Sequence, residues 1–298
     1  NFTAVDLVKR DIIALYEEDF SKFDNSGRAK AMYDAIPAQL NKNAMRYQVG
    51  KVIPDERAER IINVVKDMED SMTANVAFHS DDPNVGLALT KNLEYFKMYT
   101  SDTGLFVTLA FKDGDITENV IYEKLLNDKL SANLGYVYEN MIAQMLVSNG
   151  KDLFYHTIPY ADGKKYYETD FIITEKHKIS PIEVKSSGYK SHKSLDEFCS
   201  KFSDRIMNKY VIYTKDYKRE NGVDYIPVYM TFSGFSNFFF QKLRCKSFIV
   251  FNYFLGCSFA DDSSSFVAAV RSNVDDVVGE FYHVEIMLDD KDGITFVN

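Results

Sequence analysis

Apolar residues in the first third of the chain recur at helical spacing and predict three helices. The second of them is expected to end at the Ile36–Pro37 step, because proline disfavours a helical conformation in the residue before it. The three helices cover residues 6–19, 28–36 and 56–72.

The stretch that follows changes character. Residues 80–92 are rich in turn formers, and residues 94–111 predict a short strand, a turn at Asp102–Gly104 and a further helix. Three short helices followed by a hairpin-like stretch give the outline of a winged helix-turn-helix, an outline that many small helical bundles share. The polar run after Phe111 places a boundary near residues 113–120.

Beyond this boundary the apolar spacing alternates between helical and extended. Residues 131–150 form an amphipathic helix that ends at Asn149–Gly150, where glycine supplies the C-terminal stop. Three strands, a helix and two strands flanking the Asn221–Gly222 turn come next. They cover residues 152–160, 164–175, 179–185, 193–206, 209–215 and 224–230.

The sequence therefore predicts an α+β protein in three parts. Residues 1–115 form a helical, winged-helix-like domain, residues 116–232 a mixed-sheet domain, and residues 233–298 a C-terminal extension without an assigned role. With 46% hydrophobic residues the chain can bury a substantial core.

Cysteine use and hydropathy indicate a cytoplasmic protein. The cysteines at 199, 245 and 257 are odd in number and lack CxxC spacing, which argues against a disulfide framework or a zinc knuckle. The longest apolar stretch, residues 248–260, falls short of the roughly 20 residues that a membrane-spanning helix needs. We expect no membrane association.

The formal net charge of -9 argues against nucleic-acid binding, but this value is an average over the whole chain. Residues 116–232 carry 16 basic and 16 acidic side chains, and the span from Lys185 to Arg219 holds nine basic against four acidic. One part of an acidic chain is thus locally basic. By itself this pattern is typical of a solvated helix face.

Acidic residues gather where the predicted strands turn. In a strand, residues i and i+2 share a face, so Glu168, Asp170 and Ile172 are expected on one face and Thr169, Phe171 and Ile173 on the other. Glu183 and Lys185 share a face of the next strand, opposite Ile182 and Val184.

Pairing of these two strands would bring Asp170 to Glu183, and Glu139 on the preceding helix would add a third carboxylate. Like charges gathered in this way call for a compensating cation. Mg²⁺, which is held by one or two carboxylates together with waters and phosphate oxygens, would meet that need.

A helix acid, then Asp170, then Glu183-Val184-Lys185 after a short turn resembles the PD-(D/E)XK nuclease superfamily, and the element order resembles its restriction-endonuclease-like αβββαβ core. The resemblance implies Mg²⁺ or Mn²⁺ bound by Asp170, Glu183 and the Val184 carbonyl, with DNA as the partner. Glu139 would assist through water or metal, and Lys185 would position the attacking water.

A closer resemblance covers about residues 5–231. The segments "DIIALYEEDFSKF", "YDAIPAQLNKN", "FKMYTSDTGL", "LGYVYENMIAQML", "YETDFII" and "PIEVKSS" are similar to the C-terminal portion of prokaryotic AAA-type ATPases, where a winged-helix segment precedes a nuclease-like domain long labelled as of unknown function. This resemblance implies an upstream ATPase module. The chain itself holds no G-x-x-x-x-G-K-[ST] motif and begins without Met, so we expect a fragment of a longer protein.

Each site prediction has a plainer alternative. Asp170, Glu183 and Lys185 are also what an ordinary surface strand pair would carry, and the alternative for Glu139 is an ion pair with a nearby lysine. The fold can persist as a catalytically inactive module that binds DNA or protein. Three residues of the loop after Lys185 suit phosphate contacts or an exposed loop equally well: Lys190, His192 and Lys193.

Overall fold

The chain divides into two compact units, Asn1–Asn237 and Phe238–Asn298. In the second unit the strands β9 (Ile286–Met287) and β10 (Thr295–Phe296) pair antiparallel. The rest of the extension predicted over 233–298 lies outside the described residues. The computed structural model describes residues 2–42, 44–112, 135–160, 163, 165–231, 286–287 and 295–296.

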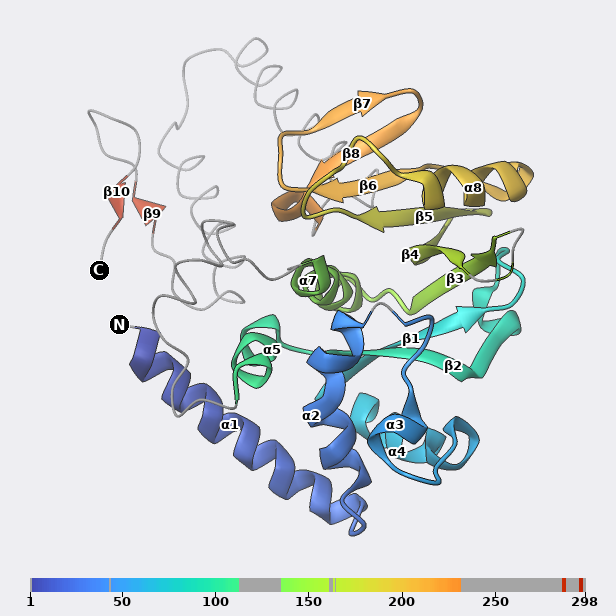
Figure 1. Ribbon diagram of the computed structural model, residues 1–298. Coiled ribbons are helices and arrows are strands. Elements are labelled where there is room, and N and C mark those ends of the chain that lie inside the picture. Colours follow the sequence, from blue (N-terminus) through green and yellow to red (C-terminus); the bar gives the residue numbers. More distant parts are fainter. Residues whose placement is uncertain are drawn as a thin grey trace, which may run out of the picture. The chain divides into compact units, whose positions relative to one another are not determined.

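Helices dominate the N-terminal part of the first unit (Figure 1). α2 continues through Pro37, so the predicted end at Ile36–Pro37 is wrong. Met32, Tyr33 and Ile36 of α2 are completely buried, and this packing offsets the hydrogen bond that proline cannot make. Among the described residues, no helix is both long and apolar enough to cross a membrane. The helices are α1 (Phe2–Phe23), α2 (Arg28–Asn41), α3 (Val49–Val52) and α4 (Ala58–Asp70).

The stretch after α4 holds a strand that the sequence pattern missed. β1 (Ala74–Ser80) is buried at all seven positions and therefore shows no alternation of polar and apolar residues. It is followed by a short helix η1 (Leu87–Thr90), β2 (Lys91–Thr100) and α5 (Thr103–Ala110). Asp102 caps α5 by accepting a hydrogen bond from the Leu105 N–H at 2.9 Å, as expected of a helix that begins at this turn.

The second part of the unit contains the predicted order of helix, three strands, helix and strand. The Asn221–Gly222 turn, however, joins β8 to the short β7 and not to the strand near 209–215. That strand, β6, pairs with β8 in parallel. The elements are α7 (Gly135–Ser148), β3 (Leu153–Pro159), β4 (Tyr166–Glu175), β5 (Lys178–Val184), α8 (Lys193–Lys201), η2 (Ser203–Arg205), β6 (Tyr210–Tyr213), β7 (Lys218–Glu220), β8 (Val223–Pro227) and η3 (Val228–Met230).

One mixed sheet runs through the first unit. In the described residues it has eight strands in the order β2-β1-β3-β4-β5-β6-β8-β7. β1 pairs with β3 in parallel, so strands from both sides of the boundary predicted near 113–120 belong to the same sheet. α7 packs against β1, β2, β3 and β5, whereas α8 packs against β4 and β5 (Figure 1). The fold is therefore α+β, with helices at the N-terminus.

A β-bulge interrupts β4 next to Asp170. Between Phe154 and His156 of β3, the partner positions on β4 step from Ile172 to Thr169, so β4 carries one extra residue. Strict alternation does not hold at this point. Phe171, predicted on the face opposite Asp170, lies with its ring 5.7 Å from that of Tyr99, whose hydroxyl reaches Glu139 on α7. The bulge thus turns both Asp170 and Phe171 toward the side that α7 covers.

A buried asparagine joins α7 to the N-terminal part of the unit. The Asn140 side chain is fully buried; its Oδ1 accepts the Thr100 N–H at 2.9 Å, and its Nδ2 donates to the Thr100 carbonyl at 3.2 Å. It also donates to the Thr103 hydroxyl at 3.2 Å. These bonds fix α7, and with it the neighbouring Glu139, relative to β2.

We expect Asn140→Ala to lower the free energy of unfolding by about 2 kcal/mol, because it leaves a buried backbone N–H and a buried carbonyl without partners. Urea denaturation measures the effect. Asn149→Ala, at an exposed position near the end of the same helix, is the matched control and should change stability by less than about 0.5 kcal/mol. Equal effects of the two substitutions would contradict the assignment.

Candidate active site

A cleft of about 380 Å³ lies where α7 meets β4 and β5. The structure brings to it all four residues predicted to be catalytic, together with one acidic residue that had been placed on the face but not in the site, Glu168. The cleft is lined by Gly135, Tyr136, Glu139, Tyr166, Glu168, Asp170, Glu183, Val184, Lys185, Ser186, Ser187 and Ser194.

The pairing of β4 with β5 sets Asp170 beside Glu183. Phe171 pairs with Ile182, and the same register continued by one residue places Asp170 opposite Glu183. The Val184 N–H donates a hydrogen bond to Asp170 Oδ2 at 2.7 Å, which ties the end of β5 to this carboxylate. The predicted convergence of these two acids depends on this register.

Glu183 is buried and only half satisfied. Its Oε1 lies 2.6 Å from Lys185 Nζ, as expected of residues that share a strand face. Its Oε2 is buried and has no hydrogen-bond partner among the described residues. Because Glu183 is 4% exposed, water does not readily compensate this oxygen, and the cleft holds a carboxylate oxygen that is available to a ligand.

One basic residue that pairs with acids of the cleft was not predicted from the sequence. Lys97 on β2, with its side chain 6% exposed, lies 3.3 Å from Glu139 Oε1 and forms an ion pair with Glu168. The Tyr99 hydroxyl donates to the same Glu139 oxygen at 2.5 Å. Glu139 therefore pairs with a lysine, as its plainer alternative predicted, and it also lines the cleft. In the sequence, the only sign of this residue's role was a single lysine between two apolar residues, Phe96 and Met98. That pattern did not indicate which side chains the lysine would contact.

Burial and crowding govern the charges of these groups. Desolvation, followed by the nearby Glu183, Glu139 and Glu168, raises the pKa of Asp170 well above its usual value. Desolvation also raises the pKa of Glu183, although Lys185 opposes the rise.

The pKa values of the two lysines that pair with these acids are raised, which favours the charged form of each lysine. Burial would lower the pKa of Lys97, but Glu139 and Glu168 overcome this effect and raise it. The pKa of Lys185 is likewise raised against desolvation, by Glu183. Both lysines are thus held charged, whereas Asp170 and Glu183 share a site that resists a second negative charge.

The donor set suits a hard divalent cation, because Mg²⁺ and Mn²⁺ prefer carboxylate oxygens and the buried Glu183 Oε2 lacks a partner. Asp170, Glu183 and the Val184 carbonyl are the residues that would hold it. Across the described ranges, however, no three His, Cys, Asp or Glu side chains are already arranged around one ion position. Rotation of the Lys185 side chain away from Glu183 would free a second oxygen.

The segment that carries the acids of the cleft is similar to a known family of domains. Residues 134–231 match the family model described as Domain of unknown function (DUF4143). Neither the curated proteins nor the solved structures that were compared with the chain gave a match. The DUF4143 match covers about a third of the chain and includes every acid of the cleft as well as Lys185. Lys97 and Tyr99 lie outside it.

The predicted phosphate-contact residues lie beside the cleft and do not line it. Lys190 and Lys193 are exposed. His192 is held on both ring nitrogens, with Nδ1 3.0 Å from Asp196 Oδ1 and Nε2 3.0 Å from the Tyr225 hydroxyl. His192 thus orders the loop before α8, and of the three residues the two lysines present their charge to solvent.

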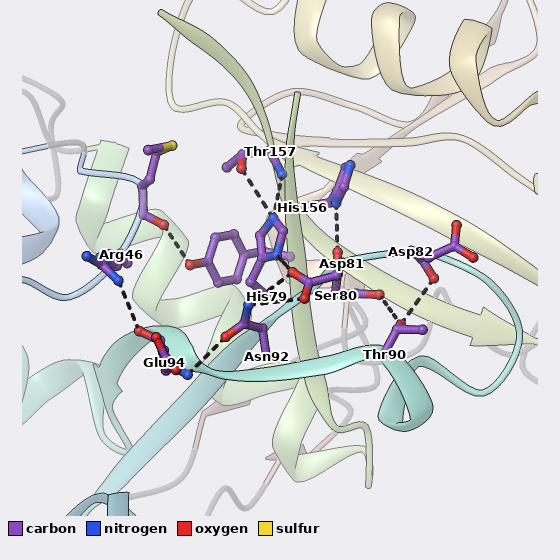
Figure 2. A network of polar contacts seen from close by, with 12 residues as sticks. Arg46, His79, Ser80, Asp81, Asp82, Thr90, Asn92, Glu94, His156 and Thr157 are labelled. Atoms are coloured by element: carbon purple, nitrogen blue, oxygen red, sulfur yellow. Dashed lines mark hydrogen bonds and ion pairs between the residues drawn. The ribbon is translucent and has the colours of Figure 1, made fainter. Parts of the chain in front are cut away.

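A second polar network surrounds two stacked histidines on β1 and β3 (Figure 2). His79 Nε2 accepts the Thr157 N–H at 3.2 Å, so its proton sits on Nδ1, which lies 2.9 Å from Asp81. His156 Nδ1 bonds to the Ser80 carbonyl at 2.7 Å, and its buried Nε2 has no hydrogen-bond partner in the part of the chain that the structure describes. Desolvation lowers the pKa of His156 to about 4.

Proposed function

We propose that the chain carries a metal-dependent, PD-(D/E)XK-like site that hydrolyses phosphodiester bonds in DNA. The observation that carries the proposal is the meeting of Asp170, Glu183 and Lys185 at one cleft, with one buried Glu183 oxygen unpartnered. A bound Mg²⁺ or Mn²⁺ would lower the pKa of a water and offset charge on the scissile phosphate.

The side chains of the cleft have distinct roles in this proposal. Asp170 and Glu183 supply carboxylate oxygens, and the Val184 carbonyl adds a third ligand. Lys185 donates a hydrogen bond to the attacking water and stabilises charge that develops on the phosphate. Glu139, fixed by Lys97 and Tyr99, orients a water at the rim.

The proposal extends to the surroundings of the site. The order α7-β3-β4-β5-α8-β6 supports a restriction-endonuclease-like core, and the four N-terminal helices with the β1–β2 pair support a winged-helix-like origin for the first segment. Lys190 and Lys193 would contact DNA phosphates. An AAA-type ATPase module upstream and a cytoplasmic location complete the proposed protein.

A nuclease assay tests the proposal. The chain is incubated with plasmid DNA, single-stranded DNA and RNA in the presence of Mn²⁺, and product formation is followed on gels. Glu183→Gln and Lys185→Met should each lower the cleavage rate by about 100-fold, because each removes a group that acts on the reacting atoms. Glu197→Gln, exposed on α8, is the matched control and should retain full activity.

Equal cleavage by all variants would identify a contaminating nuclease. If no substrate is cut by the chain or by the full-length protein with its ATPase module, the second candidate function holds, a non-catalytic module that binds DNA or protein. That candidate is favoured by one observation, that Lys97 and Lys185 already pair with acids of the cleft. Its DNA binding would be insensitive to EDTA and to Glu183→Gln.

A further inference from the structure

Lys97 pairs with two of the acids that line the cleft, although its own side chain does not line it. Its ammonium lies between the Glu139 and Glu168 side chains and contacts the Oε1 atom of each. The same Glu139 oxygen also accepts a hydrogen bond from the Tyr99 hydroxyl. Because only 6% of the Lys97 side chain is exposed, the packing of the protein holds the ammonium in this position, and water does not readily replace its contacts. Glu139 and Glu168 thus already have beside them a positive charge that the chain itself supplies.

The charges of the cleft leave room for one divalent cation. Within the described part of the chain, the carboxylates that line the cleft are Glu139, Glu168, Asp170 and Glu183, and the cations that pair with them are Lys97 and Lys185. Lys97 lies against Glu139 and Glu168, and Lys185 lies against Glu183, so Asp170 is the acid that has no cation of the described residues in contact with it. A metal ion between Glu139 and Glu168 would lie against the buried Lys97 ammonium, and such a contact between like charges is costly in a low-dielectric setting.

We infer that the Lys97 ammonium stands in place of a second metal ion, so that the site takes a single divalent cation held by Asp170 and Glu183. The inference rests on the proposed function, since it presumes that a cation binds. Lys97 is then a positioning residue, which fixes Glu139 and Glu168 without contacting substrate. Because Lys97 lies outside residues 134–231, the matched segment depends on β2 for a complete site.

The hydrogen bonds of the four acids separate them into two pairs, Glu139 with Glu168 and Asp170 with Glu183. Glu139 and Glu168 each use an oxygen to bind Lys97, at the β2 side of the cleft. Asp170 is held by the Val184 N–H, and the unpartnered Oε2 belongs to Glu183. The ligands that remain for an ion are therefore on β4 and β5, which is where the sequence placed the metal.

The number of bound Mn²⁺ ions tests the inference. Electron paramagnetic resonance of free Mn²⁺ during titration gives the stoichiometry directly, with Asp170→Asn as the baseline for ions bound elsewhere. We expect one Mn²⁺ per wild-type chain above that baseline. Lys97→Met should bind two, because it opens the position between Glu139 and Glu168, whereas Lys97→Arg and Glu168→Gln should bind one.

The outcomes separate the two proposals. Two ions in the wild type, or one ion in a folded Lys97→Met chain, overturns the role of Lys97 and leaves the proposed function standing. No ion above the baseline in the wild type overturns both. If Lys97→Met proves unfolded by circular dichroism, the wild-type number alone decides, since one ion supports the inference and two contradict it.

Discussion

Replacing Lys97 with methionine is expected to lower the free energy of unfolding, measured without metal, by about 3–5 kcal/mol. Methionine keeps most of the side-chain volume, so the loss arises from charge. Glu139 and Glu168 would remain in the cleft without the ammonium that lies 3.3 Å from one and is ion-paired with the other. Removing one partner of a buried ion pair leaves an uncompensated buried charge, which is strongly destabilising.

Lys185→Met is the matched control, because Lys185 also pairs with an acid of the cleft but has a side chain that is 28% exposed. Its removal should cost less than that of Lys97, because solvent reaches the Lys185 side chain and only one acid loses its partner. Adding Glu168→Gln to Lys97→Met should restore part of the loss, and the double-mutant cycle measures the coupling. A cost for Lys97→Met as small as that for Lys185→Met would show that Lys97 is not the charge on which this cleft depends.

Acid should destabilise the protein through His156. Burial against Phe198 and Phe202 keeps the imidazole neutral and lowers its pKa from 6.5 to about 4, an effect that His79 and Lys201 strengthen and the Ser80 carbonyl and Asp81 oppose. The unfolded chain takes up this proton near pH 6.5, whereas the folded chain resists until about pH 4. Stability from His156 is thus fully present above pH 6.5 and is lost as the pH falls toward 4, by about 3 kcal/mol.

The variant that isolates this effect is His156→Asn, because an asparagine amide can still donate to the Ser80 carbonyl but does not titrate. Urea denaturation from about pH 8 to about pH 4 gives the stability of each chain. The difference between wild type and variant should shrink by about 3 kcal/mol over that window. Because Asp170 and Glu183 titrate in both chains, their opposite pH dependence cancels in the difference. A difference that is constant with pH would contradict the assignment.

The sequence was most informative where the physical signal is local. Helical spacing located α4 and α7, and the order of elements around two strands led to three acids of the cleft and one lysine, namely Glu139, Asp170, Glu183 and Lys185. Glu183 and Lys185 lie two residues apart on β5, so their ion pair follows from strand geometry alone. The nearness of Asp170 and Glu183 needed only the hairpin between β4 and β5, which is a short-range feature.

Local rules failed where packing overrode them. α2 passes through Pro37 because its buried face compensates the lost hydrogen bond, and β1 has no alternation because both of its faces are covered. β8 pairs with β6 in parallel, whereas the Asn221–Gly222 turn joins β8 to its other neighbour, β7. The bulge in β4 turns Phe171 toward the side of the sheet that α7 covers, whereas strict alternation predicted the opposite face.

The sequence by itself determined an α+β chain with an acidic pair and a lysine on adjoining strands, because spacing along the chain fixes which side chains share a face. Only the tertiary structure decided how their charge is balanced. Lys97 reaches Glu168 across 71 residues of sequence, and Tyr99 reaches Glu139 across 40. Contacts at such separations depend on how β2 and α7 pack in one sheet, and periodicity along the chain carries no information about that packing.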